Sequence, residues 1–222
     1  MKSWRLFNWD AAWNESLFPV INISGEEMKD VMGFASKQTD NYGARGQNNE
    51  KNKIKQKSWG KMGELVTYHT LRLESFYPNS LSDRLTYPDF KIYGDVDKTW
   101  DVDITSGRDR FLVKSCGSSS ACRQKCSWVL QFSDDGGRGT DKEIFEYKSS
   151  DGNKVFSFVL VDFEERMGRV ACFCHLSVIR RYRLHLGIPI AKSLRWSKRI
   201  VYYEKLVKRL DLDNPEKRSR II

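Results

Sequence analysis

The chain lacks any run of 18 consecutive apolar residues, the length from which a membrane-spanning helix is expected. Its opening residues also lack the apolar core and small-residue cleavage site of a secretion signal. Five cysteines are an odd count, and no two form a CxxC pair, so neither a disulfide framework nor a zinc site is indicated. We therefore expect a cytoplasmic protein with no membrane partner and with reduced cysteines in its core.

Two further absences narrow the chemistry. The glycine-rich stretch 134–141 contains neither GK[ST] nor GxGxxG, which excludes a Walker loop and a dinucleotide fingerprint there. The three histidines, His69, His175 and His185, are scattered along the chain, and nothing marks one of them as a general base.

Positive charge is abundant. The formal net charge is +9 and the sequence pI is about 9.3, a balance that favours a polyanionic partner such as nucleic acid. At 222 residues, 40% of them hydrophobic, the chain can form one globular domain with a full core.

Residues 100–116 predict a β-hairpin with its turn at Gly107, because apolar and polar side chains alternate along the first strand. We predict a register in which Thr105 pairs with Arg110. In that register Asp101 lies opposite Lys114, and Asp103 shares their face.

Two neighbouring carboxylates repel each other, and a divalent cation relieves that repulsion. Because all of these ligands are hard oxygens, the pattern favours Mg²⁺, with Mn²⁺ as a substitute, and metal-assisted hydrolysis. Lys114 would hold the attacking water or stabilise charge on a phosphate. The alternative is a solvated hairpin with an ordinary cross-strand pair between Asp101 and Lys114.

Upstream, the spacing of apolar residues predicts an amphipathic helix over 59–73 that carries Glu64 in its first turns. Gly60 and Gly63 weaken such a helix by roughly 1 kcal/mol each relative to alanine. We therefore expect something to approach the start of this helix closely.

With Glu64 on a helix, Asp103 on a strand and Lys114 on the next strand, the chain resembles the PD-(D/E)xK nuclease superfamily. The resemblance covers residues 59–131, about a third of the chain. It implies an α/β fold with a mixed central sheet flanked by helices, a restriction-endonuclease-like core, and Mg²⁺ held by the two carboxylates. It also implies that Gln131 contacts the metal water or a phosphate; an edge-strand glutamine facing water is the alternative.

Leu112 departs from the family pattern, which has an acidic residue, or sometimes Asn, Gln or Ser, two positions before the lysine. Asp101 could supply the missing carboxylate, and the main-chain carbonyl near Val113 could complete the shell. A second assignment gives the role of the strand aspartate to Asp89, which follows Pro88 before an expected short strand over 90–93. We prefer Asp103, because the hairpin places it beside Lys114.

Several flanking elements follow from local signals. A capping box at Ser24 predicts a helix over about 25–37, and aromatic residues up to Phe18 are expected to pack on the domain. Residues 40–57 predict a mobile loop or a basic arm that orders on DNA. The apolar runs 155–162 and 170–176 predict two strands.

We expect residues 1–176 to form a nuclease core and residues 177–222 a basic helical region, packed on the core and contacting DNA. The residues predicted to contact DNA are Lys53, Lys55, Lys57, Arg180, Arg181, Arg195, Lys198 and Arg199.

The sequence thus predicts a Mg²⁺-dependent endonuclease acting on DNA, in first place a type II restriction-like enzyme and in second place a resolvase, repair or homing nuclease. A homodimer and a prokaryotic or viral context fit such an enzyme, although no motif encodes either of them. Leu112 also leaves open a DNA-binding module with a degenerate active site, and the charge pattern leaves open an RNA-processing protein.

Overall fold

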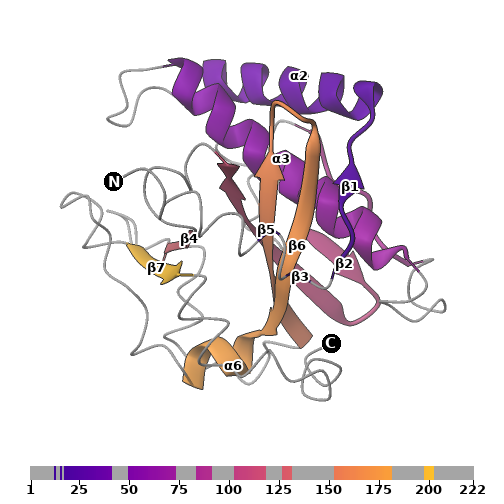
Figure 1. Cartoon of the computed structure of the whole chain (residues 1–222), viewed down its shortest axis with the longest axis vertical. Helices are drawn as coiled ribbons and strands as arrows, with labels where there is room; N and C mark the ends of the chain where they lie inside the picture. The colour runs from indigo at the N-terminus through magenta and orange to yellow at the C-terminus, as the bar shows by residue number, and fades with distance from the viewer. Residues whose placement is uncertain are drawn as a thin grey trace.

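The chain has an α/β fold built on a mixed five-stranded sheet (Figure 1). The computed structural model describes Trp13, Ser16 and residues 18–41, 50–73, 84–91, 103–118, 127–131, 153–181 and 198–202. The strands are β1 (Ile21–Asn22), β2 (Ile104–Ser106), β3 (Asp109–Gly117), β4 (Ser127–Gln131), β5 (Asn153–Asp162), β6 (Met167–His175) and β7 (Lys198–Tyr202). The helices are α2 (Gly25–Asn41), α3 (Glu50–Leu71) and α6 (Leu176–Arg181).

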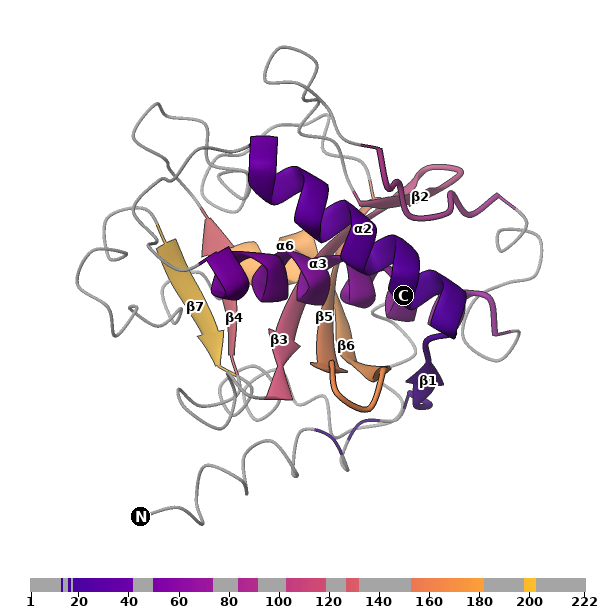
Figure 2. The same cartoon turned by 90° about the horizontal axis from the view of Figure 1, so that it is seen from above.

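The strand order in the main sheet is β1-β6-β5-β3-β2. β3 and β5 are parallel, whereas the other neighbouring strands are antiparallel. β4 and β7 form a separate antiparallel pair, and β4 lies beside β3 (Figure 2). None of the described helices is long and apolar enough to cross a membrane.

Side chains from the two faces of the sheet form two hydrophobic clusters. α2 and α3 pack on one face, against residues such as Phe111, Val113 and Val159. α6, β4 and β7 pack on the other face, where Cys116 and Phe158 lie. In Figure 1, β5 and β6 run between α2 at the top of the view and α6 at the bottom. Because side chains alternate along a strand, consecutive residues of β3 contribute to opposite clusters.

The predicted hairpin is confirmed. Thr105 pairs with Arg110, and Gly107 has a φ of 57°, which a two-residue hairpin turn requires and glycine adopts without strain. Asp103 is described immediately before β2, whereas Asp101 lies outside the described residues.

The capping box is also confirmed: Ser24 Oγ accepts a hydrogen bond from the backbone N–H of Glu27 at 3.2 Å, and Glu27 Oε2 accepts one from Ser24 N at 2.9 Å. Helix α2 begins at Gly25 as predicted and ends at Asn41. The predicted strands β5 and β6 are confirmed as an antiparallel pair.

Three expectations about local structure are wrong. α3 begins at Glu50, so residues 50–57 are helical rather than a loop or arm; the lysines, Glu50 and Gln56 favour a helix intrinsically. Phe90 and Lys91 are not in a strand, because Asp89 Oδ1 accepts a hydrogen bond from Lys91 N and closes a local turn instead. Residues 198–202 form a strand rather than a helix, with the β-branched Ile200 and Val201 paired to β4.

The described N-terminal residues pack on the domain as expected. Arg169 on β6 donates hydrogen bonds to the main-chain carbonyls of Trp13 (2.6 Å), Ser16 (2.7 Å) and Phe18. The Phe18 ring meets Phe173 edge to face, with 5.2 Å between centroids. One guanidinium therefore fixes this segment against the sheet through three acceptors.

Candidate functional site

Helix α3 lies very close to strand β3, and Gly63 makes this approach feasible. A Cβ atom on Gly63 would lie 1.9 Å from Ser115 Oγ and 3.3 Å from Val113 Cγ1. The close partner expected at the start of the helix is thus β3, and it meets the helix in its second half, since α3 begins at Glu50. This contact sets the next residue, Glu64, against the sheet.

Glu64 is 8% exposed and is held by a lysine from its own helix. Lys61 Nζ donates a hydrogen bond to Glu64 Oε2 at 2.6 Å, and the two side chains are only 12% and 11% exposed. Lys61 is not among the site residues predicted from the sequence. The signal for it was the spacing of three residues to Glu64, which places both side chains on one helix face.

Asp103 contributes the second carboxylate. Its Oδ2 accepts a hydrogen bond from the backbone N–H of Val113 at 2.6 Å, and its own N–H donates to Phe111 O at 3.1 Å. Both contacts lie at the end of the β2–β3 pairing. Asp103 is therefore oriented by main-chain groups of β3.

Burial raises the pKa of Glu64 to about 8, and the negative charges of Asp103 and Asp89 act in the same direction. The ammonium of Lys61 lowers this pKa but does not outweigh them. Glu64 and Asp103 therefore influence each other although one comes from a helix and the other from a hairpin. In the absence of another cation, the raised pKa of Glu64 favours its protonated form.

Asp89 takes part mainly through its backbone. Its carbonyl accepts a second hydrogen bond from Lys61 Nζ, at 2.6 Å, while its carboxylate closes the turn to Lys91. The Lys61 ammonium also lies 4.7 Å from the ring centroid of Phe34 and 5.6 Å from that of Phe90. Lys61 thus links segment 84–91 to α2 and α3.

The side chains of Leu112 and Lys114 lie on the face of β3 that is opposite to α3. Leu112 packs on the cluster that contains Cys116, whereas Val113 and Ser115 face α3. Strand alternation places Lys114 on the side of Leu112 and Cys116. The lysine that contacts Glu64 is Lys61, and a role for Lys114 in this site stays a prediction.

The remaining predicted site residues are placed only in part. Gln131 is the last residue of β4, and its side chain lies outside the described part of the structure. Ser115 Oγ is buried and has no hydrogen-bond partner among the described residues. Cys116, Cys172 and Cys174 are buried in the core, as expected, and burial raises the pKa of Cys174 to about 12.

The residues predicted to contact DNA are spread over several elements. Lys55 lies on α3, where its ammonium is 3.6 Å from Glu164 and stacks over Trp59. Lys53 and Lys57 share this helix. Arg180 and Arg181 belong to α6, Lys198 and Arg199 belong to β7, and Arg195 lies outside the described residues.

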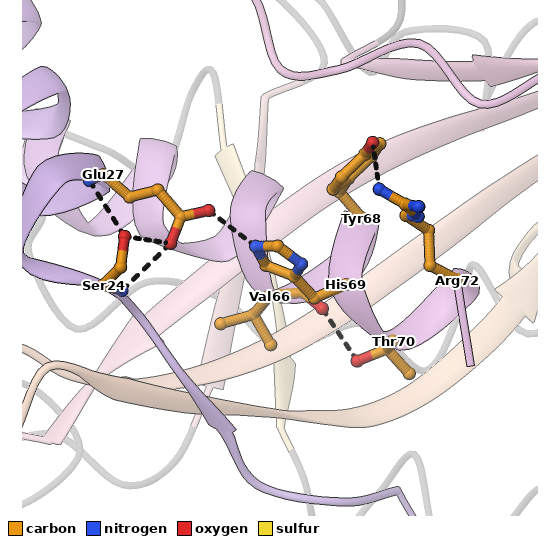
Figure 3. Close-up of polar contacts among 7 residues, drawn as sticks. All are labelled: Ser24, Glu27, Val66, Tyr68, His69, Thr70 and Arg72. Atoms are coloured by element: carbon orange, nitrogen blue, oxygen red, sulfur yellow. Dashed lines mark hydrogen bonds and ion pairs between the residues drawn. The ribbon is translucent and has the colours of Figure 1, made fainter.

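A second acid–base pair joins α3 to α2 (Figure 3). His69 Nε2 lies 2.6 Å from Glu27 Oε1, while Glu27 Oε2 is held by Ser24. Burial raises the pKa of Glu27, but the hydrogen bonds from His69 and Ser24 outweigh it and lower the pKa overall. The contact between His69 and Glu27 therefore connects α3 to α2, and Glu27 also belongs to the capping box of α2.

The donor set of Glu64 and Asp103 fits a hard cation. Mg²⁺ commonly binds through one or two carboxylates and keeps several waters, which matches two oxygen ligands from different elements. Among the described residues, no three His, Cys, Asp or Glu side chains are grouped to hold a metal ion. The described site therefore offers two carboxylates and no complete cage.

No protein-family model, no curated protein and no solved structure matches this chain.

Proposed function

We propose that this protein is a Mg²⁺-dependent nuclease that hydrolyses DNA phosphodiester bonds, with Glu64 and Asp103 as metal ligands. The observation that carries the proposal is the approach of two carboxylates from separate elements, close enough for the charge of Asp103 to raise the pKa of Glu64. A divalent cation would relieve this repulsion. The net charge of +9 suits a polyanionic substrate.

Each described residue would have a separate task. Asp103 is fixed by the Val113 N–H, and Glu64 is fixed by Lys61, so both carboxylates are held before substrate arrives. When bound, Mg²⁺ would neutralise charge on the phosphate and activate water. Because Leu112 supplies no carboxylate, Asp101 is proposed as the further ligand, with the Val113 carbonyl as another.

The finer assignment remains part of this proposal: a restriction-endonuclease-like core, a type II restriction-like activity and a homodimer that cuts both strands. It is supported by the mixed sheet, the hairpin with Asp103 and the basic C-terminal region.

The test is cleavage of plasmid and phage DNA with Mg²⁺ or Mn²⁺. We expect the wild type to cut, and Glu64→Gln and Asp103→Asn to lose at least about 100-fold in rate, as is typical when electrostatic stabilisation of a transition state is removed. Glu165→Gln, which changes an exposed acid in the β5–β6 turn, serves as the matched control and should cut normally. Equal cutting by all four proteins would refute the assignment of the site.

A second function is favoured by one observation. Leu112, at the position where the family has an acid, packs against the hydrophobic cluster around Cys116. A chain with this substitution could bind DNA without cutting it. Tight DNA binding by the wild type, with no cleavage of any DNA or RNA substrate in either metal, would favour this binding module.

A further inference from the structure

Lys61 carries an enclosed ammonium group at the candidate site. Its side chain is 12% exposed, although most lysines in proteins keep their charge in water. The rings of Phe34 and Phe90 cover it at 4.7 and 5.6 Å, and the two rings meet edge to face at 6.2 Å. Contacts from α2, α3 and segment 84–91 thus fix the position of this charge.

An ammonium has three protons, and two of those of Lys61 have specific acceptors. One is donated to Glu64 Oε2 and one to the carbonyl of Asp89, both at 2.6 Å. The bond to Glu64 engages Oε2 and leaves Oε1 as the oxygen that can ligate a cation. Charge-assisted bonds of this length define the orientation of a carboxylate well.

Lys114 lies in a different position from Lys61 relative to α3. It starts from the face of β3 that carries Leu112, opposite to the face against which α3 packs. Lys61, in contrast, contacts Glu64 directly. Of these two lysines, Lys61 is therefore the one built to orient the helix carboxylate.

We propose that Lys61 is a positioning residue for a divalent-cation site, which orients Glu64 through Oε2 and fastens segment 84–91 beside it. The inference rests on the proposed function, since it assigns a partner to one of the proposed ligands. Hydrogen-bonding partners of metal ligands typically change metal affinity about 10–100-fold when they are removed.

The experiment is a calorimetric titration of the full chain with Mn²⁺, without DNA, so that it does not depend on cleavage. We expect Lys61→Met to weaken Mn²⁺ binding by about 10-fold or more. The matched control is Lys29→Met, which removes an exposed lysine of α2 and should bind Mn²⁺ as the wild type does. Circular dichroism melting shows whether each variant folds.

If Lys61→Met does not fold, Phe34→Leu is a milder variant that tests the same inference. It removes one ring over the ammonium and leaves both hydrogen bonds of Lys61 in place. We expect it to weaken Mn²⁺ binding by about 2–3-fold, in proportion to the partial loosening of Lys61. Unchanged or tighter binding in a folded Lys61→Met, or in Phe34→Leu if Lys61→Met is unfolded, overturns the inference. A larger loss in Lys114→Met than in Lys61→Met also overturns it.

Glu64→Gln separates this inference from the proposed function. If Glu64→Gln loses Mn²⁺ binding while Lys61→Met keeps it, the metal site stands and only the role of Lys61 is wrong. If the wild type binds no Mn²⁺, or Glu64→Gln binds it equally well, the metal site itself is refuted and the role of Lys61 falls with it.

Discussion

Helix α3 takes part in two acid–base pairs with the same contact distance, but the pKa of the carboxyl group is shifted in opposite directions in the two pairs. Lys61 and Glu64 are 2.6 Å apart near its middle, and His69 and Glu27 are 2.6 Å apart near its end. The pKa of Glu64 is raised to about 8, whereas that of Glu27 is lowered. A short contact to a basic side chain therefore does not determine the charge state of a carboxyl group.

The surroundings account for the difference. Glu64 is buried near two other acids, Asp103 and Asp89, and has one cation to offset them. Glu27 is less buried and also accepts hydrogen bonds from the N–H and hydroxyl of Ser24. Ionised Glu27 therefore stabilises the fold, whereas ionised Glu64 destabilises it and would gain from a further cation.

The largest effect is expected from pH on Glu64. Since its pKa is higher in the folded chain than its usual value near 4.5, the folded state binds the extra proton between about pH 4.5 and 8. Stability should fall as pH rises through that window, by about 1.4 kcal/mol per pH unit at most. Glu64→Gln, which keeps an acceptor for Lys61, should remove this slope.

The measurement is urea denaturation between pH 5 and pH 8.5 in the presence of a chelator. The wild type should lose roughly 3–5 kcal/mol relative to Glu64→Gln across this range. Parallel pH profiles for the two proteins would show that Glu64 is ionised throughout, and the contrast with Glu27 would disappear.

A smaller effect is expected from Gly63, which lies between Lys61 and Glu64 on α3. Gly63→Ala should destabilise the chain by about 1–3 kcal/mol, since its Cβ would collide with Ser115 Oγ and push α3 away from β3. It should disturb Glu64, one residue away, more than the pair at His69. Urea denaturation measures the loss of stability.

Ser115 provides the control for that steric argument. Ser115→Ala removes the colliding and unpartnered hydroxyl, and its Cβ atom would still lie 3.1 Å from the new one. The double variant should therefore recover most of the lost stability, helped by the helix preference of alanine of about 1 kcal/mol. Additive losses in the double variant would contradict a direct collision.

The sequence predicts the capping box and the hairpin better than it predicts the surroundings of Glu64. The capping box of Ser24 and Glu27 and the register of Thr105 with Arg110 follow from signals only a few residues long, and both are confirmed. The proximity of Glu64 and Asp103 was expected only from the resemblance. Lys61 and the Asp89 carbonyl were missed, because their contact depends on where residues 84–91 cross the helices.

The start of α3 shows the same limit at the level of secondary structure. Residues 50–57 are polar apart from Ile54, and this polarity predicted a loop or a basic arm, whereas the intrinsic preference of lysine, glutamate and glutamine for helix prevails. Tertiary contacts add to it: Lys55 stacks over Trp59 and approaches Glu164 on the β5–β6 turn. The periodic apolar residues begin nine positions after the start of the helix. They therefore predicted the buried part of α3 and not the whole helix.

The smallest effect is expected at Glu27. Glu27→Gln should cost about 1 kcal/mol at neutral pH, because it weakens both the capping box and the contact with His69. Since the folded pKa of Glu27 lies below the usual value near 4.5, this contribution is present above that pH and is lost as pH falls through the folded pKa. The sign of this pH dependence is opposite to that for Glu64.

Glu26→Gln, an exposed neighbour in the same first turn, is the control in urea denaturation at pH 3 and pH 7. A difference between wild type and Glu27→Gln that is the same at both pH values would mean that Glu27 acts only through its shape, and α3 would then carry one electrostatic pair and not two.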